Sequence, residues 1–256
     1  MNRILFRLIS KITRLYEQES VMDINQRIES YWDKRSEAFN ELRLQELKSP
    51  NAKAWHALLA QHIPLDRPLR ILDVGTGTGF FTFLLCHHGH TVTGIDMSQQ
   101  MVNHARQNAS TFHSTATFEK MDATKLAYED GTFDAVLSRN LTWTLPDPKA
   151  AYTEWLRVLK PSGVILNFDS DYGKTTFARN EGHVHANVDG HILDECTAIK
   201  NSLAISQETR PAWDLKTCKQ LGAHEVSLVP DVRPYVQQDT NLQYEEIPIF
   251  MMRVVK

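Results

Sequence analysis

The sequence has few of the residues that mark disulfide-linked, metal-bound or membrane-spanning proteins. Only three of its 256 residues are cysteines, and none of them forms a CxxC pair. Neither a disulfide framework nor a zinc ribbon is therefore indicated, and reduced thiols in a cytoplasmic protein are expected. No apolar run approaches the roughly 20 residues that a membrane-spanning helix needs.

The sequence also lacks a large surplus of charge of either sign. The formal net charge is −3, so the overall balance does not indicate nucleic acid or an acidic surface as a partner. Hydrophobic residues make up 42% and charged residues 23% of the chain. This composition is ordinary for a globular protein, and the length suffices for one sizeable core.

Residues 1–22 form an amphipathic helical pattern of their own. The basic side chains share one side of such a helix: Arg3, Arg7, Lys11 and Arg14. These charges interrupt the apolar core that a signal peptide requires. Four interpretations stay open: a packing helix, an extension ahead of a start near Met22, a helix whose residues 1–16 lie on a membrane surface or a partner, and a targeting peptide.

Residues 23–256 are predicted to form a single α/β domain. Residues 23–66 have a helical pattern, and residues 67–171 then alternate buried strands with helices. This alternation predicts a mostly parallel sheet with helices on both faces. Residues 172–209 are polar and only partly helical, and they are interpreted as a cap insertion after the fifth strand. Residues 210–256 predict a helix followed by an antiparallel pair of strands.

The stretch LDVGTGTGFF directly follows the first predicted strand. It contains Gly75, Gly77 and Gly79, and glycine lets a backbone adopt positive φ and approach a ligand closely. In open parallel sheets, ligands bind beyond the carboxyl ends of the strands. Asp96 ends the next predicted strand, where a carboxylate can accept hydrogen bonds from ribose hydroxyls. The two features together predict a nucleoside site.

The spacing of the glycines indicates which nucleoside ligand fits. Dinucleotide-binding loops have the pattern GxGxxG, whereas this loop has GxGxG. Asp73 also lies two positions before Gly75, and a carboxylate disfavours a pyrophosphate but favours an ammonium group. The pattern therefore favours a nucleoside with a positively charged amino-acid tail over the dinucleotide of an oxidoreductase.

Three longer stretches carry a resemblance to a known family. ILDVGTGTGFFTFLLCHHGHTVTGIDMS, MDATKLAYEDGTFDAVLSRNLTWTL and EWLRVLKPSGVILNF resemble successive motifs of class I S-adenosylmethionine-dependent methyltransferases. The resemblance covers residues 70–168 and, more loosely, the last two strands. It implies a Rossmann-like three-layer sandwich with seven strands, the last one antiparallel. It also implies S-adenosyl-L-methionine as cofactor and S-adenosyl-L-homocysteine as product.

The resemblance assigns roles around this cofactor residue by residue. Asp96 would hold the ribose hydroxyls, Met97 would pack on the adenine, and Asp122 would address its amino edge. For Asp122 a turn cap, and for Met97 ordinary core packing, are the alternatives. The complete set of implied cofactor residues is Asp73, Gly75, Thr76, Gly77, Gly79, Asp96, Met97, Met101, Asp122, Ala123, Arg139 and Asn140.

The methyl acceptor is expected between the N-terminal helices, the loop after strand four and the cap insertion. Asn140, Trp143 and Asp169 are the candidate catalytic residues. Trp143 could instead pack against the following helix, and Asp169 could cap a turn. A general base is needed only if the acceptor arrives protonated. The candidate substrate contacts are Tyr31, Trp143, Asp171, Tyr172, His183 and Arg210.

The histidines of the insertion raise the alternative of a metal site. His183, His185, His191 and Cys196 are plausible zinc ligands, but their spacing matches no closed structural site. Metal-dependent catechol-type methyltransferases need a carboxylate at the end of strand four, where Arg139 lies here. No metal is therefore predicted.

The loop after strand four narrows the acceptor class. DNA amino-methyltransferases carry an Asp/Asn-Pro-Pro-aromatic motif there, whereas this chain has SRNLTW. No basic surface or added RNA-binding segment is visible. The sequence predicts a cytoplasmic small-molecule methyltransferase, as a monomer or a homodimer, with no DNA partner. The alternatives are a methyltransferase of protein or RNA and a non-catalytic binder of the same cofactor.

Overall fold

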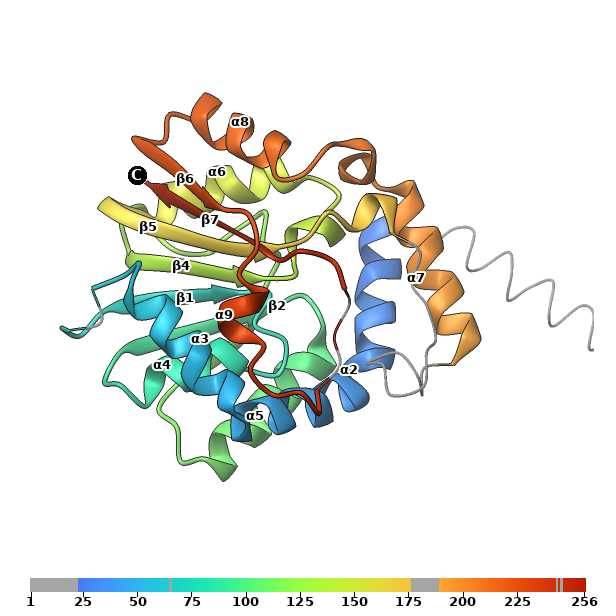
Figure 1. Cartoon of the computed structure of the whole chain (residues 1–256), viewed down its shortest axis with the longest axis horizontal. Helices are drawn as coiled ribbons and strands as arrows, with labels where there is room; N and C mark the ends of the chain where they lie inside the picture. The colour runs from blue at the N-terminus through green and yellow to red at the C-terminus, as the bar shows by residue number, and fades with distance from the viewer. Residues whose placement is uncertain (1–22, 65, 176–188, 243, 245) are drawn as a thin grey trace, which may run out of the picture.

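A seven-stranded sheet forms the centre of the computed structural model (Figure 1). The described residues are 23–64, 66–175, 189–242, 244 and 246–256. The strands are β1 (Arg70–Val74), β2 (Thr91–Asp96), β3 (Thr117–Lys120), β4 (Phe133–Arg139), β5 (Leu159–Asp169), β6 (Glu225–Val229) and β7 (Phe250–Val255). Their order is β3-β2-β1-β4-β5-β7-β6, and only β7 runs antiparallel to its neighbours. The predicted Rossmann-like fold class, with its antiparallel last strand, is confirmed.

Helices cover both faces of this sheet. The helices are α2 (Ile24–Lys48), α3 (Pro50–Ala60), α4 (Phe80–Cys86), α5 (Gln99–Thr111), α6 (Pro148–Val158), α7 (Gly190–Ser202), α8 (Ala212–Gln220) and α9 (Arg233–Val236). Figure 1 shows α6 and α8 on one side of the sheet and α3 and α4 on the other. Successive strand residues point to opposite faces, so Ile71 joins the core with Trp55, whereas Leu72 joins the core with Trp155.

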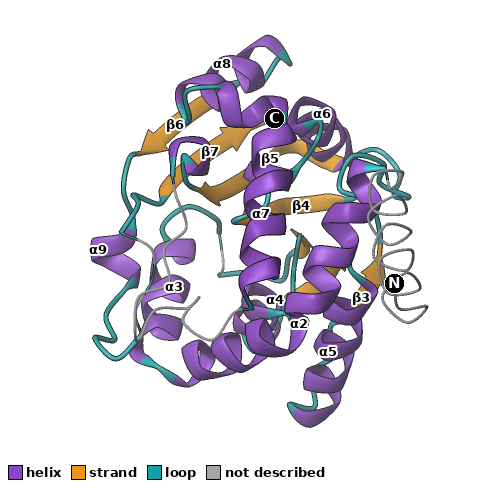
Figure 2. Ribbon diagram, turned by 90° about the vertical axis from the view of Figure 1, so that its right-hand side faces the viewer, coloured by secondary structure: helices purple, strands orange, loops and turns teal. Residues whose placement is uncertain are grey.

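Helices α2 and α7 stand side by side beyond the carboxyl ends of the parallel strands (Figures 1 and 2). Arg27 of α2 donates two hydrogen bonds to Glu195 of α7, at 2.9 and 3.0 Å. Asp33 of α2 accepts from the Ser98 hydroxyl at 2.6 Å and from the Gln100 amide at 3.1 Å, at the start of α5. Helix α2 is thus fixed at the sheet edge where ligands of this fold bind.

The fifth strand begins at Leu159, and Pro161, Ser162 and Gly163 lie within its irregular start. One segment differs from the sequence-based expectation. The connection between the last two strands contains the short helix α9, whose Val236 is fully buried. The predicted amphipathic segment 1–22 lies outside the described residues. None of the helices in the described ranges is long and apolar enough to cross a membrane.

Candidate functional site

The glycine loop adopts a backbone that side chains would disturb. Gly75, Gly77 and Gly79 have φ angles of +67°, +55° and +98°. A Cβ atom on Gly75 would lie 2.9 Å from the Leu141 side chain, and one on Gly77 would lie 2.8 Å from Phe39 Cε1. The loop is therefore built for glycine both by its conformation and by its close neighbours.

Asp73 holds the glycine loop in place through hydrogen bonds. Its Oδ2 accepts from the Thr76 hydroxyl at 2.7 Å, the Thr82 hydroxyl at 2.8 Å and the Thr82 amide at 3.2 Å. The residue is buried, and this burial raises the pKa of its carboxyl group. Asp73 also lines the cavity above the loop, so it holds the loop in shape and contributes to the cavity wall.

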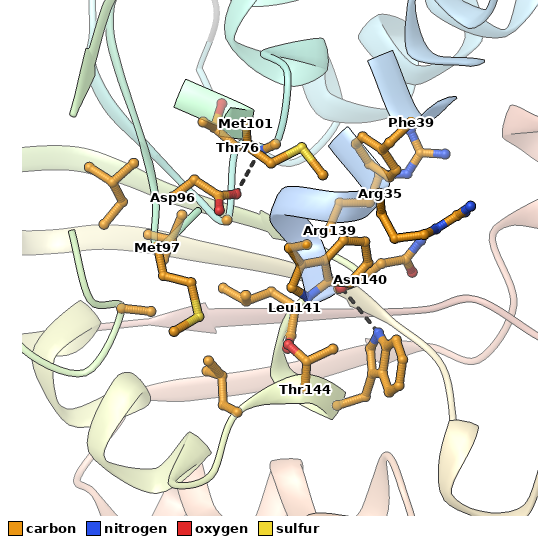
Figure 3. A pocket seen from close by; sticks show the side chains of 18 of the residues that line it. Arg35, Phe39, Thr76, Asp96, Met97, Met101, Arg139, Asn140, Leu141 and Thr144 are labelled. Atoms are coloured by element: carbon orange, nitrogen blue, oxygen red, sulfur yellow. Dashed lines mark hydrogen bonds between the residues drawn. The ribbon is translucent and has the colours of Figure 1, made fainter. Parts of the chain in front are cut away.

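Asp96 ends β2 beside the same loop. Its Oδ2 accepts from the Gly77 amide and its Oδ1 from the Ser98 amide, each at 2.9 Å. Burial raises the pKa of Asp96 to about 6. Figure 3 shows Asp96, Met97 and Met101 on one side of the cavity, facing Arg35 and Phe39 of α2.

Almost all residues predicted to contact the cofactor come together in this one cavity. Gly79 is the exception, because it caps the start of α4. Asp122 lines the cavity and also forms the turn that was its alternative, since its Oδ1 accepts from the amide and hydroxyl of Thr124 at 2.8 Å. The predicted cofactor residues in the cavity wall are Asp73, Gly75, Thr76, Gly77, Asp96, Met97, Met101, Asp122, Ala123, Arg139 and Asn140.

The candidate catalytic residues separate into two groups. Asn140 and Trp143 line the cavity, and the Trp143 indole donates to the Asn140 carbonyl at 3.1 Å. Asp169 does not line the cavity and is fully buried. Its Oδ2 accepts from the Thr142 hydroxyl, the Trp143 amide and Arg210, so this carboxylate is engaged within the protein.

Some of the candidate substrate contacts line the cavity, and others do not. Tyr31 and Tyr172 line the cavity together with Trp143. Arg210 does not, because its guanidinium is buried between Asp169 and Asp214. The geometry therefore corrects the substrate role predicted for Arg210 and the direct catalytic role predicted for Asp169.

Three remaining predictions concern the segment around the insertion. Asp171 is outside the cavity wall and lies 3.8 Å from the Lys174 ammonium. His183 and His185 lie outside the described residues, and His191 is exposed in the first turn of α7. Within the part of the chain that the structure describes, no group of three or more His, Cys, Asp or Glu side chains could hold a metal ion.

The largest group of cavity-wall residues that the sequence did not predict lies on α2. These residues share one helix face and the spacing i, i+3, i+4, which was visible in the sequence but is equally typical of core packing. A second contribution comes from the segment before β7. The additional wall residues from α2, α7 and this segment include Trp32, Arg35, Phe39, Leu42, Arg43, Cys196, Tyr244, Ile247 and Ile249.

The fold and the glycine loop define a doubly wound α/β protein with a ligand cavity at the carboxyl edge of its sheet. A family model described as "Methyltransferase domain" matches residues 72–167. Over these residues the chain matches a methyltransferase domain, as the resemblance to class I S-adenosylmethionine-dependent methyltransferases implied.

Curated relatives are similar over the same region. Phosphatidylethanolamine N-methyltransferase of Cereibacter sphaeroides is 35% identical over 121 residues, which are 46% of this chain and 55% of the relative. Demethylmenaquinone methyltransferase of Deinococcus radiodurans is 36% identical over 120 residues, which are 45% of this chain and 50% of the relative. The chain thus spans about half the length of these relatives.

Solved structures share the fold over a longer stretch. A protein of Methanococcus maripaludis, assigned as an S-adenosyl-L-methionine-dependent methyltransferase, matches 88% of this chain and 93% of its own, with a TM-score of 0.60 and 14% identity. Phosphoethanolamine N-methyltransferase 2 of Haemonchus contortus, in complex with S-adenosyl-L-methionine, matches 74% of this chain and 49% of its own, with a TM-score of 0.54 and 16% identity. At these identities the likeness concerns the fold.

Proposed function

We propose that this chain is an S-adenosylmethionine-dependent methyltransferase that acts on a small-molecule acceptor. The position of Asp96 carries the proposal. Its carboxylate lines the cavity, each oxygen uses one backbone donor, and an oxygen of this type has capacity for a second donor. The two hydroxyls of a ribose are the donors that such a carboxylate would accept.

The other cavity residues fit the remaining parts of this cofactor. The left-handed glycine loop offers a close backbone approach beside Asp73, and Met97 offers an apolar surface for the adenine. Asn140 Oδ1 is buried with no hydrogen-bond partner among the described residues, so it can accept from a ligand donor. When bound, the cofactor supplies a methyl group on a positively charged sulfur.

The acceptor side of the cavity is aromatic. Trp143 and Tyr172 pack with ring centroids 4.7 Å apart and are 9% and 7% exposed, and Tyr31 lines the same side. Burial raises the pKa of Tyr31 and of the neighbouring Cys196 thiol, so neither serves as a base near neutral pH. We infer that these side chains align an acceptor with an apolar or aromatic body and exclude water from it.

The names of relatives support a small-molecule acceptor. Two of them name phosphatidylethanolamine and demethylmenaquinone, which are small molecules rather than nucleic acids or proteins. The three cysteines are free thiols, which supports a cytoplasmic location for the reaction.

Isothermal titration with S-adenosylhomocysteine and with NADH tests the cofactor. We expect saturable binding of S-adenosylhomocysteine and none of NADH, and a preference for NADH would refute the proposal. Transfer of a labelled methyl group is then measured on small aromatic and lipid acceptors, peptides and RNA. Transfer to the small acceptors is expected, whereas cofactor binding without any transfer would favour the non-catalytic binder.

A further inference from the structure

A buried ionic cluster forms part of the cavity wall beside the glycine loop. It consists of Arg43 and Glu46 of α2 and Arg139 at the end of β4, and Glu46 is only 1% exposed. Glu46 Oε2 accepts from Arg43 Nη1 and, at 3.2 Å, from Arg139 Nη1. Its Oε1 accepts from Arg139 Nη2 at 2.9 Å and from the Trp55 indole at 3.3 Å. The acceptor capacity of Glu46 is thus largely used.

The cluster holds two cations against one anion. Burial alone would raise the pKa of Glu46, but the charges of Arg139 and Arg43 outweigh it and lower the pKa to about 2. Glu46 is therefore ionised, and within the cluster one positive charge is left over. The charge of Arg139 also lowers the pKa of the nearby Asp73 carboxyl, although burial raises that pKa overall. A buried positive charge that is only partly neutralised is costly, so such a surplus is expected where an anion binds.

Arg139 is held firmly within this cluster. Its guanidinium carbon lies 4.5 Å from the Trp55 ring centroid and 5.0 Å from the Phe80 ring centroid. Two of its nitrogens face Glu46, whereas its Nε has no hydrogen-bond partner among the residues that the structure describes. Arg43 is less fully engaged, since a single hydrogen bond joins it to Glu46.

The cluster lies on the side of the cavity that faces the glycine loop. Phe39, one helical turn before Arg43, lies so close to Gly77 that a Cβ atom there would be 2.8 Å from its ring. The guanidinium carbon of Arg43 lies 4.8 Å from the centroid of the same ring. Arg43, Arg139 and Gly77 all line the cavity, which has the carboxylate of Asp73 on its loop side. The cavity wall thus contains both a carboxylate and arginines, which match the two charged groups of a zwitterion.

We propose that Arg43 binds the carboxylate of the cofactor's amino-acid tail, with Glu46 and Arg139 as positioning residues. Glu46 holds Arg139 by two parallel hydrogen bonds. Because Glu46 bonds mainly to Arg139, the guanidinium of Arg43 keeps N–H donors for a second anion. The proposal rests on the proposed function, because it concerns the tail of that cofactor. It adds a contact to the amino-acid tail of the cofactor that is independent of the contact between Asp96 and the ribose.

Three ligands that differ only in the tail test this contact by calorimetry. They are S-adenosylhomocysteine, its decarboxylated amine analogue, and 5′-methylthioadenosine, which lacks the amino-acid part. A charge-assisted hydrogen bond corresponds to about a tenfold change in affinity or more. The protein should therefore prefer S-adenosylhomocysteine to the amine analogue by about this factor. Arg43→Gln should abolish that preference and leave 5′-methylthioadenosine binding within about twofold.

Two further variants control for charge and for folding. Arg43→Lys keeps the charge and should keep part of the preference. Arg27→Gln removes an arginine ion pair from the same helix outside the cavity wall and should change nothing. Methylthioadenosine binding reports a folded cavity in every variant.

Each contrary result has its own meaning. Equal binding of S-adenosylhomocysteine and the amine analogue by the unmodified protein would overturn the carboxylate contact. So would an unchanged preference in Arg43→Gln, which would assign the carboxylate contact to another group of the cavity wall. If Arg43→Gln does not fold, a reduced preference in folded Arg43→Lys supports the contact, and full retention of the preference overturns it. Failure of all three ligands to bind the unmodified protein would refute the proposed function itself.

Discussion

The surroundings of Asp96 affect the pKa of its carboxyl group in opposite directions. Burial raises its pKa to about 6, although the amides of Ser98 and Gly77 donate to it and favour the ionised form. The charges of Asp73 and Asp33 raise the pKa further. In the ligand-free protein, this raised pKa stabilises the fold below pH about 4, and the contribution is lost as the pH rises through about 6. Ribose hydroxyls would offset this loss, because they bond best to the ionised carboxylate.

Binding of S-adenosylhomocysteine should therefore strengthen as the pH rises from about 5 to about 7. Asp96→Asn should weaken binding by roughly tenfold to a hundredfold, because it removes a charge-assisted acceptor, and should flatten the pH profile. Calorimetry at constant ionic strength measures both effects. Asp134→Asn is the matched control, since Asp134 pairs with Lys160 outside the cavity wall. The same pH slope in Asp96→Asn as in the unmodified protein would contradict this interpretation.

A buried polar network fixes the short helix that carries Trp143. This 3-10 helix, η1 (Thr142–Thr144), follows β4, and Asp169 at the end of β5 accepts from its Thr142 hydroxyl and Trp143 amide. Arg210 donates to Asp169 at 3.1 Å, to Asp214 at 2.7 Å and to the Thr142 hydroxyl at 2.6 Å. The network thus ties the element after β4 to β5 and α8, and it sets the position of the aromatic wall.

Arg210→Gln should lower the free energy of unfolding by about 3–5 kcal/mol, because it leaves Asp169 and Asp214 as buried charges without their cation. Urea denaturation followed by circular dichroism measures this change. Arg253→Gln is the control, since its partner Glu225 is more than half exposed and the loss should stay below about 1 kcal/mol. Similar losses in the two variants would show that the network contributes little to stability.

Across the whole molecule, the sequence predicted what depends on near neighbours in the chain. The sheet, the glycine loop and Asp96 follow from strand periodicity and from spacings within about one βαβ unit. The arginines of α2 that line the cavity, Arg35 and Arg43, were not predicted, because their place in its wall depends on how that helix crosses the sheet edge. Asp169 was placed wrongly in the reaction zone, because its position in the chain gives the strand end but not which face its side chain takes.

The edge of the sheet opposite the cavity contains a cluster of three histidines, His56, His88 and His90. The rings of His56 and His88 stack with centroids 3.8 Å apart, and His90 is buried beside them just before β2. Burial lowers the pKa of His56 and His90, and the neighbouring His88 lowers both further. His90 Nδ1 also accepts from the Leu69 amide at 3.3 Å, so a proton on Nδ1 would break this bond. The fold therefore needs His90 in its neutral form.

This requirement predicts how stability depends on pH at a distance from the cavity. Because the folded-state pKa lies below the unfolded value near 6.5, the unfolded chain takes up protons first as the pH falls. The histidines thus stabilise the fold fully above about pH 6.5 and lose this contribution as the pH falls through the folded-state pKa.

His90→Asn keeps an acceptor near the Nδ1 position but cannot titrate. The difference in unfolding free energy between the unmodified protein and this variant should shrink from pH 7.5 to 5.5, as measured by urea denaturation. The raised pKa of Asp96 acts in the opposite direction, but it is common to both proteins and cancels in the difference. A difference that stays constant or grows toward pH 5.5 would show that protonation of His90 does not oppose folding.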